Sequence, residues 1–208
     1  MEVRGRTRIV VVGSGQLGAA VQDVLARAGH ELVTVGRTSG MFQADISDMA
    51  SLKTLFARIG TCDAVANAAG DVFPAPLAGA TDEQWSSSIG SKGMGQINLA
   101  RAALPHLTDN GSITLVSGVL GDEVTPACTI GATVNRMVEG FAQAAATELP
   151  RGIRINCVSP TVLTESVSYH PYFPGFGPVP AEEVAQAYLR AIANPIMGRI
   201  LKLHKTAS

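Results

Sequence analysis

The stretch Val10-Val11-Val12-Gly13-Ser14-Gly15-Gln16-Leu17-Gly18 decides the fold predicted for this chain. It completes a β-branched apolar run, Arg8–Val12, typical of a strand buried on both faces, and a helical pattern follows over Leu17–Ala28. A G-x-G-x-x-G turn between a strand and a helix suits a dinucleotide, because its glycines permit a tight turn, approach of a pyrophosphate and close helix–strand packing. An ordinary glycine turn is the alternative. The flanking elements favour dinucleotide binding by Gly13, Ser14, Gly15, Gln16, Leu17 and Gly18.

Strand and helix patterns alternate along the whole chain. The further predicted strands are short, mostly apolar runs: Glu31–Val35, Met41–Ala44, Asp63–Asn67, Ser112–Ser117, Arg154–Val158 and Arg199–Leu203. The further helical patterns cover Asp48–Ile59, Thr81 to about Leu104, Ile130–Leu149 and the residues after Pro180. This alternation predicts an α/β fold, a Rossmann-like doubly wound parallel sheet of about seven strands with helices on both faces, in three layers.

Composition limits the classes of protein that fit. With 208 residues, 46% of them hydrophobic, and a net charge of -1, the chain is predicted to form one domain, residues 1–208. The balanced charge argues against nucleic acid and anionic membranes as partners, and no apolar run reaches the roughly 18 to 20 residues of a membrane span. Cys62, Cys128 and Cys157 lie far apart, which predicts no disulfide framework, no metal site and a cytoplasmic location.

The end of the second predicted strand indicates which dinucleotide binds. An NAD site has an acidic side chain there to hold the ribose 2′-hydroxyl, whereas this chain has Gly36 followed by Arg37, Thr38 and Ser39. A guanidinium beside two hydroxyls suits a 2′-phosphate. The alternative is a solvent-exposed arginine in a polar loop. The sequence therefore predicts NADP(H) as the cofactor.

Further motifs resemble those of the short-chain dehydrogenase/reductase (SDR) family over essentially the whole chain. The resemblance implies that Asp45 and Ile46 touch the adenine, and that the turn of Asn67, Ala68, Ala69 and Gly70 replaces the family's N-N-A-G turn. Ser117 stands where the family keeps a catalytic serine. The segment Arg154–Pro160 resembles the stretch before the loop on the nicotinamide side, where Pro160, Thr161, Val162 and Thr164 are the implied cofactor contacts.

The chain departs from the family at the proton donor. The resemblance places the family's catalytic tyrosine and lysine at Gly131 and Asn135, and no tyrosine lies on the predicted helix around them. Asn135 can hydrogen-bond a ribose hydroxyl but supplies no charge. Lys92 follows Trp85 by seven residues, where the family has an asparagine, and shares its inward helical stripe. A lysine in an apolar pocket suits acid–base catalysis; the alternative is a stem on apolar surface with its amine in water.

These observations lead to a predicted function with open alternatives. We expect an NADP(H)-dependent oxidoreductase that acts on a carbonyl or alcohol of a small molecule, with Ser117 polarising the carbonyl and Lys92 supplying the proton. The loop Thr164–Pro180, rich in proline, glycine and aromatic residues, would close over the substrate. The alternatives are an NADP(H) sensor or scaffold without redox activity, and an enzyme for a non-redox step such as isomerisation. By resemblance we expect a homodimer or homotetramer.

Three further residues are expected to have a structural or surface role. His170, in the aromatic loop, is interpreted as a surface histidine, with substrate contact as the alternative. Cys128 is interpreted as a small buried thiol. Asp122 is expected to be a solvated loop charge.

Overall fold

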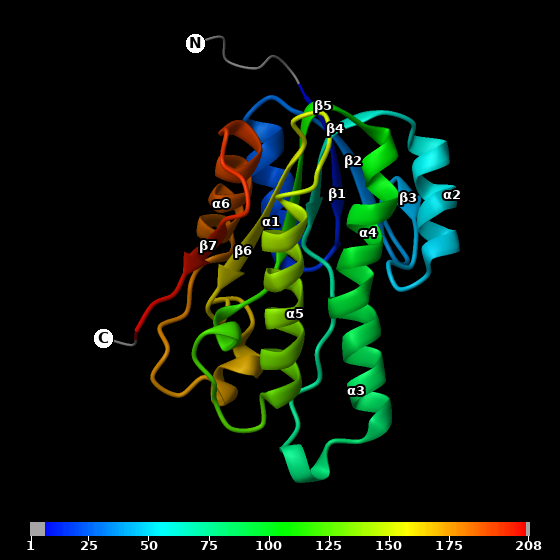
Figure 1. Ribbon diagram of the computed structural model, residues 1–208. Coiled ribbons are helices and arrows are strands. Elements are labelled where there is room, and N and C mark those ends of the chain that lie inside the picture. Colours follow the sequence, from blue (N-terminus) through cyan, green and yellow to red (C-terminus); the bar gives the residue numbers. More distant parts are fainter. Residues whose placement is uncertain (1–6, 207–208) are drawn as a thin grey trace.

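One parallel sheet organises the chain. In the computed structural model, which describes residues 7–206, seven strands lie in the order β3-β2-β1-β4-β5-β6-β7 (Figure 1). The strands are β1 (Arg8–Val12), β2 (Glu31–Gly36), β3 (Phe42–Gln43), β4 (Cys62–Asn67), β5 (Leu107–Val116), β6 (Arg154–Pro160) and β7 (Ile200–Leu203). Every neighbouring pair is parallel. The strand order reverses between β1 and β4, which is where such sheets bind ligands beyond their carboxyl ends.

Helices cover both faces of the sheet, as the alternating pattern predicts (Figure 1). The helices are α1 (Gln16–Arg27), α2 (Met49–Ile59), α3 (Asp82–Ser88), α4 (Gly95–Ala103), α5 (Thr129–Ala145) and α6 (Ala181–Ala193). Apolar residues of α1 and α6 pack with one face of the sheet in one core, and those of α2, α4 and α5 pack with the other face in a second core. The three-layer α/β prediction is confirmed. In the described residues no helix is both long and apolar enough to cross a membrane.

Two predicted boundaries, the start of β5 and the end of α5, differ from the structure by four residues or more. β5 begins at Leu107, five residues before the predicted start, because Leu107 pairs with Cys62 ahead of a register shift in the ladder. The residues before Ser112 are mostly polar, and Asn110 has a φ of 59°, so the apolar pattern does not predict this part of the strand. α5 ends at Ala145 rather than near Leu149.

The long helix predicted from Thr81 to about Leu104 contains an irregular turn. α3 begins with a capping box between Thr81 and Gln84, and a π-helical segment, Ile89–Met94, then joins α3 to α4. A π segment inserts extra backbone into a helix and is frequent at functional sites. Lys92 lies within it.

The predicted substrate loop is attached at its start. The Gln16 side chain donates to the Glu165 carbonyl and accepts from the Ser166 hydroxyl, at 2.9 and 3.0 Å. Both carboxylate oxygens of Glu165 accept from the backbone N–H of Ala181, at the N-terminus of α6. Within the loop, a 3-10 segment spans Val167–Tyr172. These bonds link the loop directly to the first turn of α1.

Tyr188 of α6 forms a buried hydrogen bond with the end of β4. Its side chain is fully buried, and its hydroxyl donates to the Asn67 carbonyl at 2.7 Å. Replacing Tyr188 by Phe leaves that buried carbonyl without this donor, so we expect the free energy of unfolding to fall by about 1 to 3 kcal/mol in urea denaturation. The exposed Tyr169→Phe is the control and should change stability by less than about 0.5 kcal/mol. Equal effects of the two variants would contradict this role of the Tyr188 hydroxyl.

Candidate active site

The glycine-rich turn brings β1, α1 and the end of β4 into very close contact. Gly13 has a φ of 121°, and a Cβ there would lie 2.8 Å from the Ala68 carbonyl carbon. A Cβ on Gly18 would lie 2.2 Å from the Gly13 carbonyl oxygen. Gly15 is different, because a Cβ on it would meet nothing within 4 Å. Gly15 is the N-cap of α1 and makes no side-chain cap, so the first N–H groups of the helix are free for a ligand.

Two cavities meet at the carboxyl edge of the sheet. The first, of about 230 Å³, lies between the glycine turn and the end of β2 and includes Gly36, Arg37 and Ile46 in its wall. The second, of about 220 Å³, extends toward β5, β6 and the aromatic loop. Ala68, Ala69 and Gly70 line both cavities. Together the cavities form a trough that crosses the point where the strand order reverses.

Arg37 lies at the wall of the first cavity, within an exposed ion pair. Its Nη2 lies 3.2 Å from Asp71 Oδ2, and both side chains are more than half exposed. A Cβ on Gly36 would lie 2.8 Å from the Ser39 carbonyl oxygen, so the backbone leaves no room there for an acidic side chain. The absence of the carboxylate expected at an NAD site therefore follows from the shape of this turn.

Lys92 faces the second cavity, as its place on the predicted stripe indicates. Its Nζ donates to the backbone oxygen of Ser117 at 3.2 Å, which links the long helix to the end of β5. Burial lowers the pKa of Lys92 to about 8, against the raising effect of the carboxylates of Glu139 and Asp71. The Cys157 thiol nearby is neutral at that pH, because burial raises its pKa to about 12. Lys92 is thus a cation that can release its proton near neutral pH.

Known proteins share this sequence and fold. A family model described as enoyl-(acyl carrier protein) reductase matches residues 13–195. The chain belongs to the short-chain dehydrogenase/reductase family. The solved structure of the protein lin1944 from Listeria innocua is 39% identical, has a TM-score of 0.91, and the match covers 94% of this chain and 98% of that one.

Two further SDR relatives bear on the activity. The structure of a small-chain dehydrogenase in complex with NADPH is 26% identical, with a TM-score of 0.84 over 95% of this chain and 96% of that chain. A Staphylococcus epidermidis protein named as an uncharacterized oxidoreductase is 23% identical over 217 residues, which cover 93% of this chain and 94% of its own. Its membership of the SDR family therefore makes the chain an oxidoreductase of that family.

Against this SDR background, Ser117 has a partner that the sequence analysis missed. Its hydroxyl donates to Glu139 Oε1 at 2.7 Å, and the Glu139 side chain is only 3% exposed. Arg136, one turn earlier on α5, places its Nη1 3.3 Å from the other Glu139 oxygen. The Ser117 proton is therefore directed at a carboxylate rather than into the cavity. One signal for Glu139 was its spacing of four residues from Asn135, which puts both on one face of α5.

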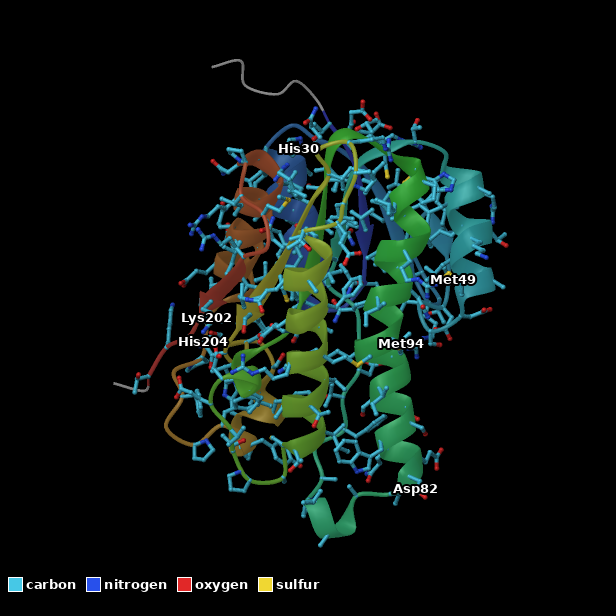
Figure 2. All side chains as sticks on the ribbon, in the orientation of Figure 1. His30, Met49, Asp82, Met94, Lys202 and His204 are labelled. Atoms are coloured by element: carbon cyan, nitrogen blue, oxygen red, sulfur yellow. The ribbon has the colours of Figure 1, made fainter. Side chains whose placement is uncertain are left out.

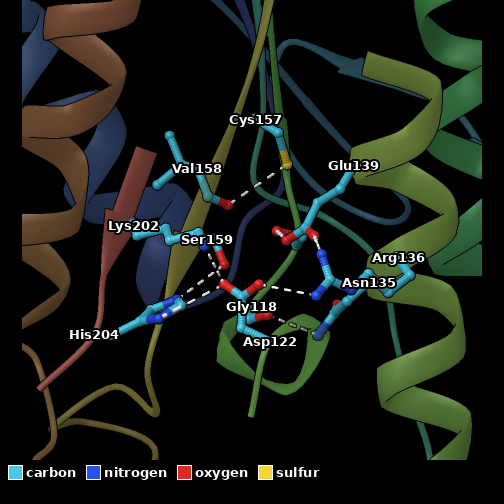
Figure 3. Close-up of polar contacts among 11 residues, drawn as sticks. Gly118, Asp122, Asn135, Arg136, Glu139, Cys157, Val158, Ser159, Lys202 and His204 are labelled. Atoms are coloured by element: carbon cyan, nitrogen blue, oxygen red, sulfur yellow. Dashed lines mark hydrogen bonds and ion pairs between the residues drawn. The ribbon is translucent and has the colours of Figure 1, made fainter. Parts of the chain in front are cut away.

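The same ion pairs continue to the last strand. Arg136 Nη2 lies 3.0 Å from Asp122 Oδ1, and Lys202 Nζ lies 2.7 Å from Asp122 Oδ2. Lys202 and His204 lie close together at the end of β7 (Figure 2), and both side chains face Asp122 (Figure 3). The expectation that Asp122 is a solvated loop charge is wrong, because its side chain is 19% exposed and holds three elements together. The hydrogen bond to Lys202 is the main cause of the lowered pKa of Asp122.

Two buried polar atoms at the second cavity have no partner among the described residues. Asn135 Nδ2 donates to the Gly118 carbonyl at 3.2 Å, but Asn135 Oδ1 accepts no hydrogen bond. The Thr161 hydroxyl is likewise unpaired. Buried polar atoms are rarely left without partners, so these two fit a site that a polar ligand completes. With the open space at Gly15, they match what a bound dinucleotide requires.

The structure brings together most of the predicted site residues. Those that line the two cavities are Gly13, Ser14, Gly15, Leu17, Arg37, Ile46, Ala68, Ala69, Gly70, Lys92, Ser117, Asn135, Pro160, Thr161 and Val162. Gly18 and Asn67 lie behind them: Gly18 packs against Gly13, and the Asn67 side chain closes the turn through Ala69. Ser39 is adjacent to Gly36 rather than in the wall. His170 Nε2 lies 2.9 Å from the Leu163 carbonyl oxygen, to which it donates, and His170 lines neither cavity.

Four further predicted cofactor contacts, besides Gly18, Ser39 and Asn67, lie away from the cavity walls. Asp45 accepts from the backbone and hydroxyl of Ser47, and these bonds lower its pKa. Gln16 binds the substrate loop. Thr38 is exposed, and so is Thr164, whose neighbours Leu163 and Ser166 line the second cavity instead. None of these four residues lines either cavity, so their roles stay predictions. In the described part of the chain, no three His, Cys, Asp or Glu residues form a group that could hold a metal ion.

Gly15 faces open space whereas Gly18 is packed against Gly13, so substituting each should separate cofactor binding from stability. Gly15→Ala adds a methyl group to open space, so the protein should keep its melting temperature within about 2 °C while NADPH affinity falls at least tenfold. Gly18→Ala places a methyl group against the Gly13 carbonyl and should lower the melting temperature by several degrees. Thermal unfolding and cofactor titration of both variants test this. Unchanged NADPH affinity in a folded Gly15→Ala protein would remove the glycine turn from cofactor binding.

Proposed function

We propose that this SDR protein is an NADP(H)-dependent oxidoreductase that interconverts a carbonyl and an alcohol of a small molecule, with Lys92 as the proton donor. The observation that carries the proposal is the position of Lys92, which lines the second cavity and whose Nζ lies 3.2 Å from the Ser117 carbonyl oxygen. NADPH, when bound, supplies the hydride that reduces the carbonyl carbon. The chain itself must then supply the proton for the carbonyl oxygen.

Lys92 can perform this step without the family's tyrosine. Its ammonium group has three N–H donors, one of which is used by the Ser117 carbonyl. A remaining N–H can bond the substrate oxygen and transfer its proton as negative charge develops there. A pKa of about 8 lies near neutral pH, which favours both protonation of Lys92 and release of the proton. The neutral amine then regains a proton from water through the open cavity.

Ser117 has a smaller part in this proposal than the sequence analysis expects. Its hydroxyl proton is bonded to Glu139, so polarisation of a carbonyl by Ser117 would require that bond to break. Glu139 itself acts on Lys92, because its buried negative charge stabilises the protonated amine. We assign Glu139 as a positioning residue, and Asn135 Oδ1 and Thr161 Oγ1 as acceptors for polar groups of the bound cofactor.

The preference for NADP(H) is supported by the first cavity. Arg37 lies in its wall and no carboxylate stands at the end of β2, where it would repel a 2′-phosphate. A relative solved with NADPH agrees with this preference. Anaerobic mixing of the protein with NADPH and a panel of ketones and aldehydes tests the function. Loss of the nicotinamide absorbance is expected; NADPH binding without oxidation for any carbonyl would favour the sensor or scaffold alternative.

Arg37 should distinguish the two nicotinamide cofactors. Arg37→Ala removes a charge-assisted contact worth about 1.5 to 3 kcal/mol, so NADPH affinity should fall about ten- to a hundredfold while NADH affinity stays within a few fold. Asp71→Asn removes the carboxylate that pairs with Arg37 and should strengthen NADPH binding. Titration of both cofactors measures each effect. Equal losses for NADPH and NADH in Arg37→Ala would show that another group contacts the 2′-phosphate.

Lys92 should control turnover rather than cofactor binding. Lys92→Met keeps most of the length of the stem and removes the proton, so kcat should fall by about a hundredfold or more with NADPH affinity within a few fold. Ser117→Ala should lower kcat by less than about tenfold, because its proton is held by Glu139. The matched control is Lys53→Met, at an exposed lysine of α2, which should keep full turnover. Full turnover in a folded Lys92→Met protein would exclude Lys92 as the acid.

The pH dependence gives a second measurement of the same residue. Because the donor is the protonated amine, the rate of carbonyl reduction should be constant below the Lys92 pKa and fall as the pH rises through about 8. Glu139→Gln removes a charge that raises this pKa while Asp71 remains, so the fall should move to lower pH. If Glu139 had only a structural role, Glu139→Gln would lower the rate at every pH, and the pH at which the rate falls would not change.

A further inference from the structure

A third cavity adjoins the second and has in its wall Gly131, the residue that replaces the family's tyrosine. It has a volume of about 140 Å³ and is mainly apolar, with Val72, Leu120, Cys128, Tyr172 and Phe173 in its wall. Gly131 also lines it, and a Cβ at this position would lie 3.1 Å from Leu120 Cδ1 and 3.5 Å from Val72 Cγ1. A side chain at residue 131 would therefore point between two wall residues. The third cavity is open at this point because Gly131 has no side chain to fill it.

The buried polar groups of the third cavity lie at its border with the second. Lys92 and Asn135 line both cavities, and Asn135 is 2% exposed with its Oδ1 unpaired. The remaining walls are mainly hydrocarbon and aromatic, and Cys128 and Leu120 belong to a small hydrophobic cluster against which Phe173 packs. A ligand in this cavity therefore meets buried polar groups beside the proton donor, whereas the other polar wall residues, Tyr169 and Tyr172, are exposed.

The charge of this cavity lies at its border with the second. There the Nζ of Lys92 donates to the Ser117 carbonyl at 3.2 Å. Among the described residues that line this cavity, no other side chain is charged. A ligand carboxylate placed deeper in the cavity, away from Lys92, would lose its hydration against apolar walls with no cation beside it. The cavity therefore suits a neutral group.

The size of the cavity limits that group to about one ring. Dry apolar cavities of about 150 Å³ in other proteins hold one benzene molecule. We propose that the third cavity is the substrate subsite and that it selects a neutral aldehyde or ketone with a single aromatic or similarly sized apolar ring, its carbonyl directed at Lys92. This inference rests on the proposed function, and it adds the class of substrate.

Binding without turnover tests the subsite. The protein saturated with NADP⁺ would be titrated with acetophenone, and with 4-acetylbenzoate and acetone as comparison ligands, by ligand-observed NMR. Acetophenone should bind at least tenfold more tightly than either, because acetone leaves the ring space empty and 4-acetylbenzoate brings a carboxylate to its far end. Similar affinities for the three ligands would overturn the inference.

Variants then place the bound ring in this cavity. Gly131→Val should lower the affinity for acetophenone at least tenfold, because its side chain fills the ring space, and should leave the affinity for NADP⁺ within a few fold. Tyr172 lines the third cavity but neither of the first two, so Tyr172→Ala enlarges only this cavity. The variant should raise the affinity for the larger 2-acetonaphthone relative to that for acetophenone. It replaces Gly131→Val in the test if Gly131→Val does not fold. The control Val167→Ala lies in the same loop, is exposed and lines none of the three cavities. Unchanged ligand preference in Tyr172→Ala would place the ring elsewhere.

The outcome separates this inference from the proposed function. Reduction of other carbonyls together with no acetophenone binding would leave the oxidoreductase intact and overturn the subsite. Acetophenone binding that Gly131→Val or Tyr172→Ala alters, with no NADPH oxidation by any carbonyl, would support the subsite and contradict the proposed reaction.

Discussion

The contact between α1 and the turn that precedes it is the constraint on which the site depends. With 2.2 Å between a hypothetical Gly18 Cβ and the Gly13 carbonyl, only a glycine lets the helix begin this close to the end of β1. That approach aims the uncapped N–H groups of α1 at the trough, next to the turn after β4. Tyr188 and Asn67 fix this second turn from inside the protein, so both walls of the trough rest on buried backbone contacts.

Charge is distributed around the second cavity differently from the arrangement that the family resemblance implies. There, α5 would carry both the tyrosine and the lysine; here it carries Glu139 and Asn135, and the lysine comes from the π segment of the long helix. A buried carboxylate is costly unless donors and cations surround it. Ser117, Arg136 and Lys92 meet that requirement from three different elements, and Arg136 extends the network to Asp122 and β7.

The sequence predicts features that depend on local pattern. Strand and helix periodicity predicts the sheet and its layers, and the spacing from Trp85 places Lys92 on the inward face. The π turn is not visible in that pattern, because its residues still follow an approximate helical stripe. The bond between Ser117 and Glu139 joins residues 22 apart, one just after a strand and one on a helix, so only the packing of α5 on the sheet reveals it. Asp122 was misjudged for the same reason, since its cations lie on α5 and β7.

One position couples the chemistry to the shape of the substrate in the proposed reaction. A tyrosine at residue 131 would supply a proton donor and would fill space between Leu120 and Val72. Glycine removes both, which opens the third cavity and leaves proton transfer to another residue. Lys92 lies on the wall that the second and third cavities share, so the replacement acid borders the space that glycine creates. A ring bound in that space would carry its carbonyl to Lys92, the charged donor of the shared wall. The loss at residue 131 and the use of Lys92 are therefore two parts of one arrangement.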